Sequence, residues 1–380
     1  MEYSVPYILL ICFYGILALW YHTTNDATRR GSIVLLCAVV FLTFFGFRGF
    51  CFFDWNAYYP GFQSITEDLH MAVFVEKWYE PGFTALMVIC KQIYDNYQFF
   101  VFVCCLIDTV LLTRFLSKYV SNVPFGFIIF LCMGGLGLTT DLLRNAIAIL
   151  IFMNAIQYIE TRRPIPYFTA CLVAISFHLS ALIYLPLYFI LHRNWTRWGF
   201  ASIFLIGNII LILHIPILKS IISLFASFID PTTQQYIDEY TSLLPAASFQ
   251  ISIGFLERLF TFGLIFIYYN KLKEIQRGHI LLNSMSLFFF MLLLLSEFRT
   301  VSIRMSMLFA FAYAPIWIDL IKCFSKPRNK ILYVVIISLY CFIKMYSSTN
   351  SIIYHYDNAL LGADSFNTRK AIYQRNYDEK

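Results

Sequence analysis

The sequence predicts an all-α integral membrane protein. Of its 380 residues, 59% are hydrophobic and only 13% are charged, whereas soluble domains carry about 25% charged residues. Apolar runs of about 13 to 20 residues recur along the whole chain, as expected for transmembrane helices. Ten cysteines are scattered without the spacing of a disulfide framework or a metal site.

The apolar runs predict about twelve transmembrane helices in one multispanning membrane domain, residues 1–347. In order they are 3–21, 32–47, 98–113, 124–140, 141–159, 165–177, 180–191, 198–215, 251–269, 280–296, 303–321 and 331–347. Segment 81–94 is too short and too polar for a span, so we interpret it as a re-entrant or interfacial helix. Segment 164–192 is interpreted as two spans that turn near residues 176–180, because basic clusters flank both of its ends.

The charges between the spans predict the orientation. Cytoplasmic connections are rich in Lys and Arg, and such clusters occur at 29–30, 114–118, 162–163, 193–197, 271–277 and 322–330. Alternating the spans against these clusters places both termini outside. The outer loops are then 48–97, which is acidic, and 216–250, which contains an amphipathic stretch at 218–229. The tail 348–380 is polar and mixed in charge, so we expect it to be extracytoplasmic and loosely ordered.

Five arginines lie in or beside apolar segments, where a guanidinium is costly unless a partner or a watery cavity receives it. They are Arg48, Arg144, Arg258, Arg299 and Arg304. The predicted topology places most of them at the outer face. Because the planar fork of arginine suits phosphate, this set indicates a site for a phosphate-bearing, lipid-linked substrate.

Four further side chains at the outer face are candidate general bases for a sugar hydroxyl: His178, Asp54, Glu80 and Asp141. Structural roles remain open for several of these residues. Arg48 and Arg304 also fit snorkelling to lipid head groups, and Arg144 with Asp141 fits an ion pair at i, i+3 spacing. His178 could instead be a polar residue that caps the turn, and Asp54 could be an ordinary loop residue. We see no metal-binding acidic pair, so we expect no metal and no cofactor, and no basic run that indicates nucleic acid.

Five short motifs in chain order resemble those of the EpsG family of bacterial exopolysaccharide membrane proteins, which is similar to the Wzy-type O-antigen and capsule polymerases. They are Phe47–Gly49 with Asp54–Tyr58, then Glu80–Phe83, Leu143–Ala148, Phe177–Ala181 and Arg304–Met307. The chain departs from the family pattern at two places. Asn145 stands where the family more often has Gln, and Leu179 follows His178 where Lys or Arg is common.

The resemblance implies a GT-C-like membrane glycosyltransferase in the bacterial plasma (inner) membrane. Such an enzyme transfers a growing glycan from undecaprenyl diphosphate onto an incoming lipid-linked repeat unit at the outer leaflet. Arg48, Arg144 and Arg304 would bind the diphosphate, and His178 or Asp54 would be the base or orient the acceptor. Arg299, Arg258, Glu80 and Tyr58 would complete the diphosphate and sugar site. A chain-length regulator and a flippase are the implied protein partners.

Three other functions remain open. A flippase or transporter of lipid-linked oligosaccharide would also need arginines for diphosphate, but its charged groups would line both halves of a central path. A polysaccharide ligase is mechanistically close to a polymerase. A membrane O-acyltransferase would use a histidine facing the cytoplasm, whereas His178 is predicted outside.

Overall fold

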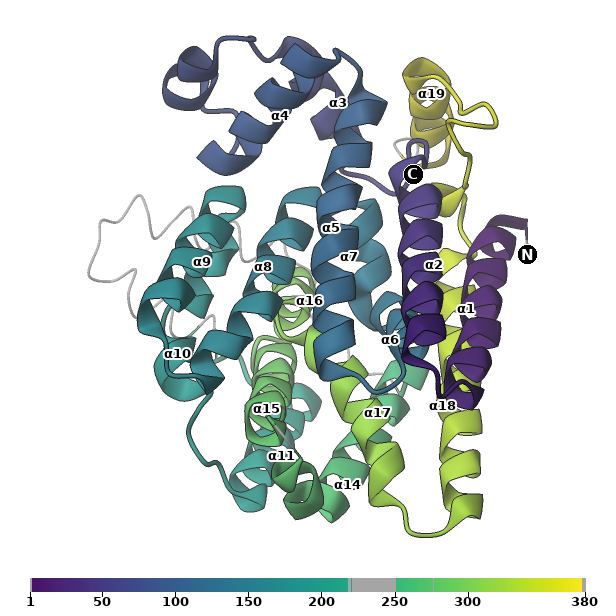
Figure 1. Cartoon of the computed structure of the whole chain (residues 1–380). Helices are drawn as coiled ribbons and strands as arrows, with labels where there is room; N and C mark the ends of the chain where they lie inside the picture. Colours follow the sequence, from purple (N-terminus) through teal and green to yellow (C-terminus); the bar gives the residue numbers. More distant parts are fainter. Residues whose placement is uncertain (1, 218–219, 221–250, 276, 378–380) are drawn as a thin grey trace. The chain divides into compact units, whose positions relative to one another are not determined.

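The computed structural model describes residues 2–217, 220, 251–275 and 277–377 (Figure 1). Most of the predicted outer loop 216–250, with its amphipathic stretch, lies outside these residues. The described chain is built of helices, which confirms the all-α prediction, and it divides into two compact units. Unit 1 comprises residues 1–190 and 326–380, and unit 2 comprises residues 191–325.

Unit 1 contains the helices of the N-terminal half and the C-terminal helices. They are α1 (Val5–Thr23), α2 (Ala27–Gly46), α3 (Trp55–Ser64), α4 (Pro81–Ile93), α5 (Tyr97–Tyr119), α6 (Val123–Phe130), α7 (Leu136–Thr140), α8 (Leu143–Glu160), α9 (Pro164–Phe177), α10 (Leu187–Ile190), α18 (Pro327–Thr349) and α19 (Phe366–Tyr377). Shorter helical turns include η2 (Met71–Glu76), η3 (Leu131–Gly135) and η4 (Leu179–Tyr184).

Unit 2 contains α11 (Arg197–Ile212), α14 (Ile253–Glu274), α15 (Gly278–Leu294), α16 (Arg299–Met307), η5 (Ala310–Ala312) and α17 (Tyr313–Cys323). Its helices pack through aromatic rings. Phe262 of α14 stacks on Phe204 of α11 with ring centroids 4.0 Å apart, and Phe289 of α15 meets the same Phe204 edge-on at 4.9 Å.

Local sequence explains where many of these helices begin. Pro stands in the first turn of α4, α6, α9 and α18, where its missing N–H costs nothing. Asn96 caps α5 by accepting from the backbone N–H groups of Gln98 and Phe99. Asn122 caps α6 in the same way through Phe125.

Each of the twelve predicted spans coincides with helical structure, but fewer helices meet the criteria of a complete span. Among the described residues, five segments are long and apolar enough to cross a membrane: α1, α2, α5, the continuous run Val123–Thr140, and α18. The pair of α16 with residues 310–323 is bent by 52°, and it makes a sixth segment when the two helices are counted as one broken span. Several remaining segments are shorter than a span or carry charge, as α14 does at Glu257 and Arg258. Twelve crossings therefore stay a prediction.

Segment 164–190 folds back on itself, as the sequence predicted. The helix α9 ends at Phe177, and His178 adopts an extended backbone with φ −157° and ψ 129°. The chain then returns beside α9 through η4 and α10, so that Tyr167 and Tyr188 lie with ring centroids 5.2 Å apart. The Tyr167 hydroxyl also donates to the carbonyl of Tyr184.

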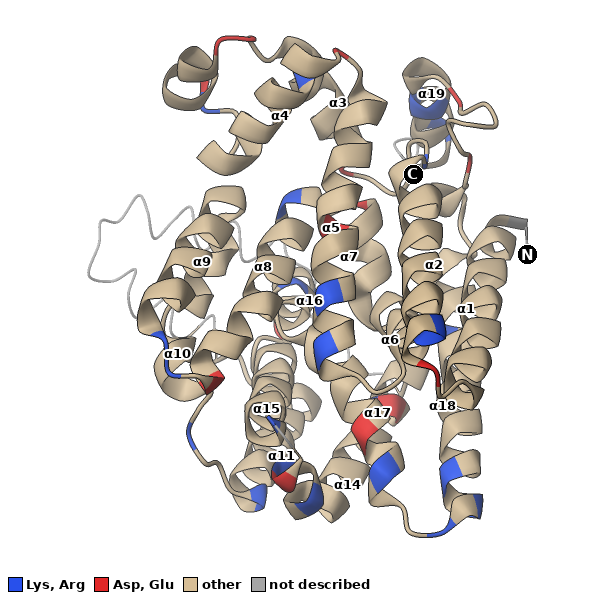
Figure 2. Cartoon of the chain, viewed as in Figure 1, with Lys and Arg blue, Asp and Glu red and all other residues tan. Residues whose placement is uncertain are grey.

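The basic clusters of unit 1 lie at one end of its helices. The amide of Asn122, just after α5, donates to Ala18 near the end of α1, and Lys118 donates to Gln157 near the end of α8. The clusters 29–30, 114–118, 162–163 and 326–330 adjoin these helix ends. Figure 2 shows them in blue toward the lower end of unit 1, whereas most of the acidic residues of 48–80 lie toward its upper end. The two ends of unit 1 thus differ in charge.

The basic clusters of unit 2 also gather at one end of that unit. Tyr269 and Lys273 of α14 both donate to the carbonyl of Trp195, and Lys271 donates to the carbonyl of Cys323. The clusters 193–197 and 271–277 therefore meet beside the end of α17.

The described part of the C-terminal tail, up to residue 377, is folded, contrary to the expectation of loose order from its polar composition. Residues 352–354 form a 3-10 turn and Phe366–Tyr377 form α19. The tail is held by hydrogen bonds to residues 43–52, and aromatic side chains of both segments pack together. Composition did not reveal these contacts because each partner lies about 300 positions away in the sequence.

Candidate functional site

A carboxylate in unit 1 contacts side chains from two other segments, and one of these side chains contacts a third segment. Glu80 Oε1 lies 2.7 Å from Nδ1 of His178, and Glu80 Oε2 lies 2.6 Å from Nη1 of Arg144. Arg144 Nε also faces the Tyr58 hydroxyl at 3.4 Å. The structure therefore brings together four of the predicted site residues, which come from α3, the start of α4, the start of α8 and the end of α9.

The close approach of α4 and α9 depends on a glycine. Glu80 precedes Pro81, which begins α4, and Gly82 lies against Ser176 in the last turn of α9. A Cβ at Gly82 would lie 2.9 Å from the carbonyl oxygen of Ser176 and would also collide with its hydroxyl. The absence of a side chain at residue 82 thus lets the first turn of α4 reach His178.

An apolar cluster fixes the backbone next to each of the four site residues. Tyr58 and Phe83 belong to this cluster, as does Leu143, the neighbour of Arg144. Phe177, which precedes His178, packs against it. Because buried side chains at this density tolerate little displacement, the polar groups are held by rigid neighbours.

The environment of Glu80 keeps its carboxyl group ionised. Burial acts to raise its pKa, but the hydrogen bond from His178, the backbone N–H of Leu179 at 3.1 Å and the charge of Arg144 outweigh burial. The pKa is lowered from 4.5 to about 2. Glu80 is therefore a hydrogen-bond acceptor at neutral pH and a poor proton carrier.

An ionised Glu80 determines which nitrogen of His178 carries a proton. A carboxylate only accepts hydrogen bonds, so Nδ1 of the imidazole must be protonated to donate to it. In the neutral ring this leaves the lone pair on Nε2, the nitrogen available to accept a proton from a substrate. The side chain of His178 is 28% exposed. This is the carboxylate–histidine arrangement used in general-base catalysis.

Arg144 combines an ion pair with aromatic contacts. Its guanidinium carbon lies 5.0 Å from the ring centroid of Tyr79 and 5.9 Å from that of Tyr58. Burial raises the pKa of both tyrosines, so their hydroxyl groups stay neutral. The side chain of Arg144 is 27% exposed, which leaves part of its fork accessible to an anion.

Arg48 is buried and engaged with the protein backbone. Only 5% of the residue is exposed. Its Nη1 donates to the carbonyl of Phe45 at 2.9 Å, and its Nη2 donates to the carbonyl of Thr140 at 3.1 Å. The side chain thereby ties the end of α2 to the end of α7. In this conformation Arg48 supports the site structurally, and its predicted contact with diphosphate stays a prediction.

Asp141 and Asp54 organise the segment that leads into α3. Asp141 Oδ1 accepts from the backbone N–H groups of Phe53 at 3.0 Å and Asp54 at 2.6 Å. Asp54 precedes α3 and is half-buried, and its charge reaches Tyr58. Among the described residues, no three His, Cys, Asp or Glu side chains lie close enough to hold a metal ion.

The other three predicted arginines belong to unit 2. Arg299 and Arg304 are exposed on α16, and Ser302 between them donates to the carbonyl of Leu292 on α15. Arg258 is half-buried on α14, with its guanidinium 6.0 Å from the ring centroid of Phe255. That these arginines share one cavity with Arg144 stays a prediction.

Both departures from the family pattern take part in contacts near the site. Asn145 accepts a hydrogen bond from the hydroxyl of Ser180 at 3.1 Å, which links α8 to the turn after His178. At Leu179 the side chain is exposed, but the backbone N–H donates to Glu80. The turn is thus held by contacts that do not need the usual side chains.

Two further carboxylates are buried on helices of the two units. Asp108 is not among the predicted site residues, yet it is 1% exposed on the apolar helix α5, and its Oδ1 has no hydrogen-bond partner in the described part of the chain. Glu257 accepts from Thr261 at 2.6 Å and from Tyr313 at 3.4 Å. An acidic residue inside an apolar helix is itself a signal of function, and that rule identifies Asp108 from sequence.

Comparison with known proteins gives one match. A protein-family model described as the EpsG family matches residues 33–358. This range covers most of the chain and includes every predicted site residue. No curated protein and no solved structure matches the chain.

Proposed function

The chain belongs to the EpsG family, and from this premise we propose that it is a polysaccharide polymerase that works at the outer face of the membrane. The family indicates a polymerase-type function of the glycosyltransferase kind. The donor we propose is a growing glycan on undecaprenyl diphosphate, and the acceptor is an incoming lipid-linked repeat unit.

The observation that carries this proposal is the junction at Glu80. One carboxylate contacts His178 at 2.7 Å and Arg144 at 2.6 Å. A glycosyl transfer from a diphosphate needs a base at the attacking hydroxyl and positive charge at the leaving group. His178 and Arg144 supply these two functions, and Glu80 holds both side chains in place.

The proposed reaction proceeds as follows. The acceptor hydroxyl gives its proton to Nε2 of His178 as its oxygen bonds to the anomeric carbon of the donor. The bond from that carbon to the diphosphate oxygen breaks, and the diphosphate leaves with the electron pair near Arg144. Glu80 stabilises the imidazolium that forms. Asp54, on the segment leading into α3, is the alternative base.

The outer location is supported by charge. The Glu80 junction joins the starts of α4 and α8 to the end of α9, whereas the basic clusters of unit 1 adjoin the ends of α1, α5 and α8 and the starts of α9 and α18. Because basic connections favour the cytoplasm, this arrangement favours an extracytoplasmic site, where lipid-linked repeat units would be joined.

The test is polymerisation of a purified lipid-diphosphate repeat unit by the reconstituted protein. We expect a ladder of lengthening glycans from the wild type, and its loss in Arg144→Ala and His178→Ala. Two exposed residues far from the junction provide matched controls, His22→Ala and Arg29→Ala, which should keep the ladder. If the wild type instead moves lipid-linked units to the opposite leaflet without lengthening them, the protein is a transporter.

A further inference from the structure

The chain after α18 folds back onto the segment that carries Arg48. We call residues 350–377 the C-terminal clasp. Three backbone hydrogen bonds join it to residues 47–52: Gly49 N–H to the Asp357 carbonyl at 3.0 Å, Phe52 N–H to the Ile353 carbonyl at 2.8 Å, and Ala359 N–H to the Phe47 carbonyl at 2.7 Å. The clasp therefore pairs with this segment along its length and does more than touch it at one point.

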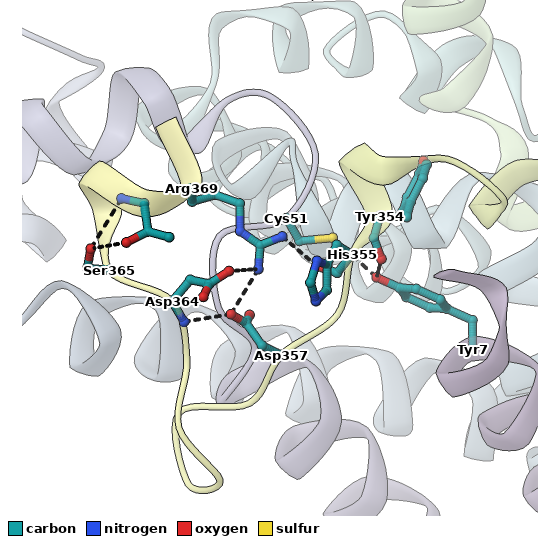
Figure 3. A network of polar contacts seen from close by, with 9 residues as sticks. Tyr7, Cys51, Tyr354, His355, Asp357, Asp364, Ser365 and Arg369 are labelled. Carbon is teal, nitrogen blue, oxygen red and sulfur yellow. Dashed lines mark hydrogen bonds and ion pairs between the residues drawn. The ribbon is translucent and has the colours of Figure 1, made fainter. Parts of the chain in front are cut away.

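A buried arginine holds the clasp in shape (Figure 3). Arg369 of α19 is 4% exposed. Its Nη2 lies 2.8 Å from Oδ2 of Asp357 and 3.2 Å from Oδ2 of Asp364, and its Nη1 donates to the carbonyl of His355 at 3.2 Å. Because the guanidinium is buried, losing it would leave two partly buried carboxylates without their cation.

The side of Asp357 that does not face Arg369 lies against Gly49. A Cβ at Gly49 would collide with the Asp357 carboxylate. The Arg369–Asp357 ion pair is thus tightly packed against the backbone of residues 47–52. The clasp is also bound to α1, because the Tyr7 hydroxyl donates to the carbonyl of Tyr354 at 3.1 Å (Figure 3).

Aromatic side chains connect the clasp to α3. Phe366 of α19 stacks on Tyr59 with ring centroids 4.3 Å apart and meets Trp55 edge-on at 5.6 Å. Tyr373 of α19 lies 6.2 Å from the same Trp55. The position of α3 therefore depends on α19.

The helix α3 also carries Tyr58, which contacts Arg144 at the Glu80 junction. We propose that Arg369 is a positioning residue: its ion pairs hold the C-terminal clasp, the clasp holds α3, and α3 places Tyr58 against Arg144. This inference rests on the proposed function for its effect on catalysis. The family match ends at residue 358, so Arg369 and α19 lie beyond the matched segment.

The test uses the full chain reconstituted with the lipid-diphosphate repeat unit. Arg369→Ala is compared with Arg369→Lys and with Arg375→Ala, a matched control because Arg375 is exposed on the same helix. We expect Arg369→Ala to raise the KM for the repeat unit by roughly 10- to 100-fold. Lysine should restore part of the loss, and Arg375→Ala should leave KM unchanged. A smaller folded fraction alone would lower the maximal rate and not change KM.

A second measurement reports on the clasp without activity. Tryptophan is replaced by 5-fluorotryptophan, and the ¹⁹F NMR signal of Trp55 is assigned with Trp55→Phe. Arg369→Ala should shift this signal and Arg375→Ala should not. If Arg369→Ala does not accumulate, Asp357→Asn removes the shorter of the two ion pairs at nearly constant size and should also shift the Trp55 signal.

The outcomes separate this inference from the proposed function. An unchanged KM together with an unchanged Trp55 signal in Arg369→Ala overturns the inference while the wild-type ladder stands. A wild type that makes no ladder overturns the proposed function, and the Trp55 signal then decides whether Arg369 positions α3.

Discussion

At the scale of single residues, Glu80 is the group on which the candidate site depends most. It accepts from a histidine ring, an arginine and a backbone N–H, so its charge is shared among groups from two other helices. A neutral amide of the same size could not accept as strongly and would present an N–H₂ group to these donors. The charge of Glu80, more than its size, is therefore what the junction requires.

Replacing Glu80 by Gln tests this requirement. We expect Glu80→Gln to lower kcat by about 100-fold or more, because the Nδ1–H tautomer of His178 loses its charged acceptor. Polymer formation by the reconstituted variant measures the effect. Glu76→Gln is a matched control, since Glu76 is exposed in the same outer segment. Equal rates for Glu80→Gln and wild type would show that the carboxylate is structural only.

The lowered pKa of Glu80 predicts how stability depends on pH. A carboxyl group with a depressed pKa stabilises the folded state above its ordinary pKa and loses that contribution as the pH falls through the folded value. For Glu80 the window lies between 4.5 and about 2. The Tm difference between wild type and Glu80→Gln should thus shrink as the pH falls from 4.5 towards about 2. A Tm difference that does not shrink below pH 4.5 would contradict this assignment.

At the scale of elements, the approach of α4 to α9 decides whether the junction forms. Gly82 has no side chain, and the backbone of Ser176 cannot give way as a flexible side chain could. We expect Gly82→Ala to cost about 1–3 kcal/mol by overpacking and to abolish polymer formation by separating Glu80 from His178. Thermal unfolding in detergent and the ladder assay measure the two effects.

Gly15 provides the control for this substitution. It lies in α1, and nothing stands within 4 Å of a Cβ placed there. Gly15→Ala should therefore keep activity and gain helix propensity. If both alanine variants behave alike, close approach at Gly82 is not what assembles the site.

At the scale of the whole molecule, the proposed function depends on which end of unit 1 faces outward. The C-terminal clasp is proposed outside and the 29–30 cluster inside. In a Cys12→Ser background, which removes the exposed cysteine, Leu361→Cys should react with an impermeant maleimide in intact cells. Leu361 is 90% exposed. Arg29→Cys should react only after permeabilisation, and the reverse pattern would place the Glu80 junction in the cytoplasm.

The sequence by itself determined the helical membrane class, the approximate positions of the apolar helices and the break at His178. These follow from local properties: apolar runs, proline and asparagine at helix starts, and charge placement. The motifs also indicated the family that the match over residues 33–358 shows.

Only the tertiary structure decided which of those residues meet. Glu80 pairs with Arg144 and His178, which are 64 and 98 positions away, and Arg48 is buried against backbone carbonyls. The folding of the C-terminal clasp was likewise not predicted. In the sequence, residues that form a buried ion pair, such as Arg369 and Asp357, cannot be told apart from the charged residues of a disordered polar tail. Sequence patterns report what a side chain prefers locally, whereas partners distant in the chain are chosen by packing.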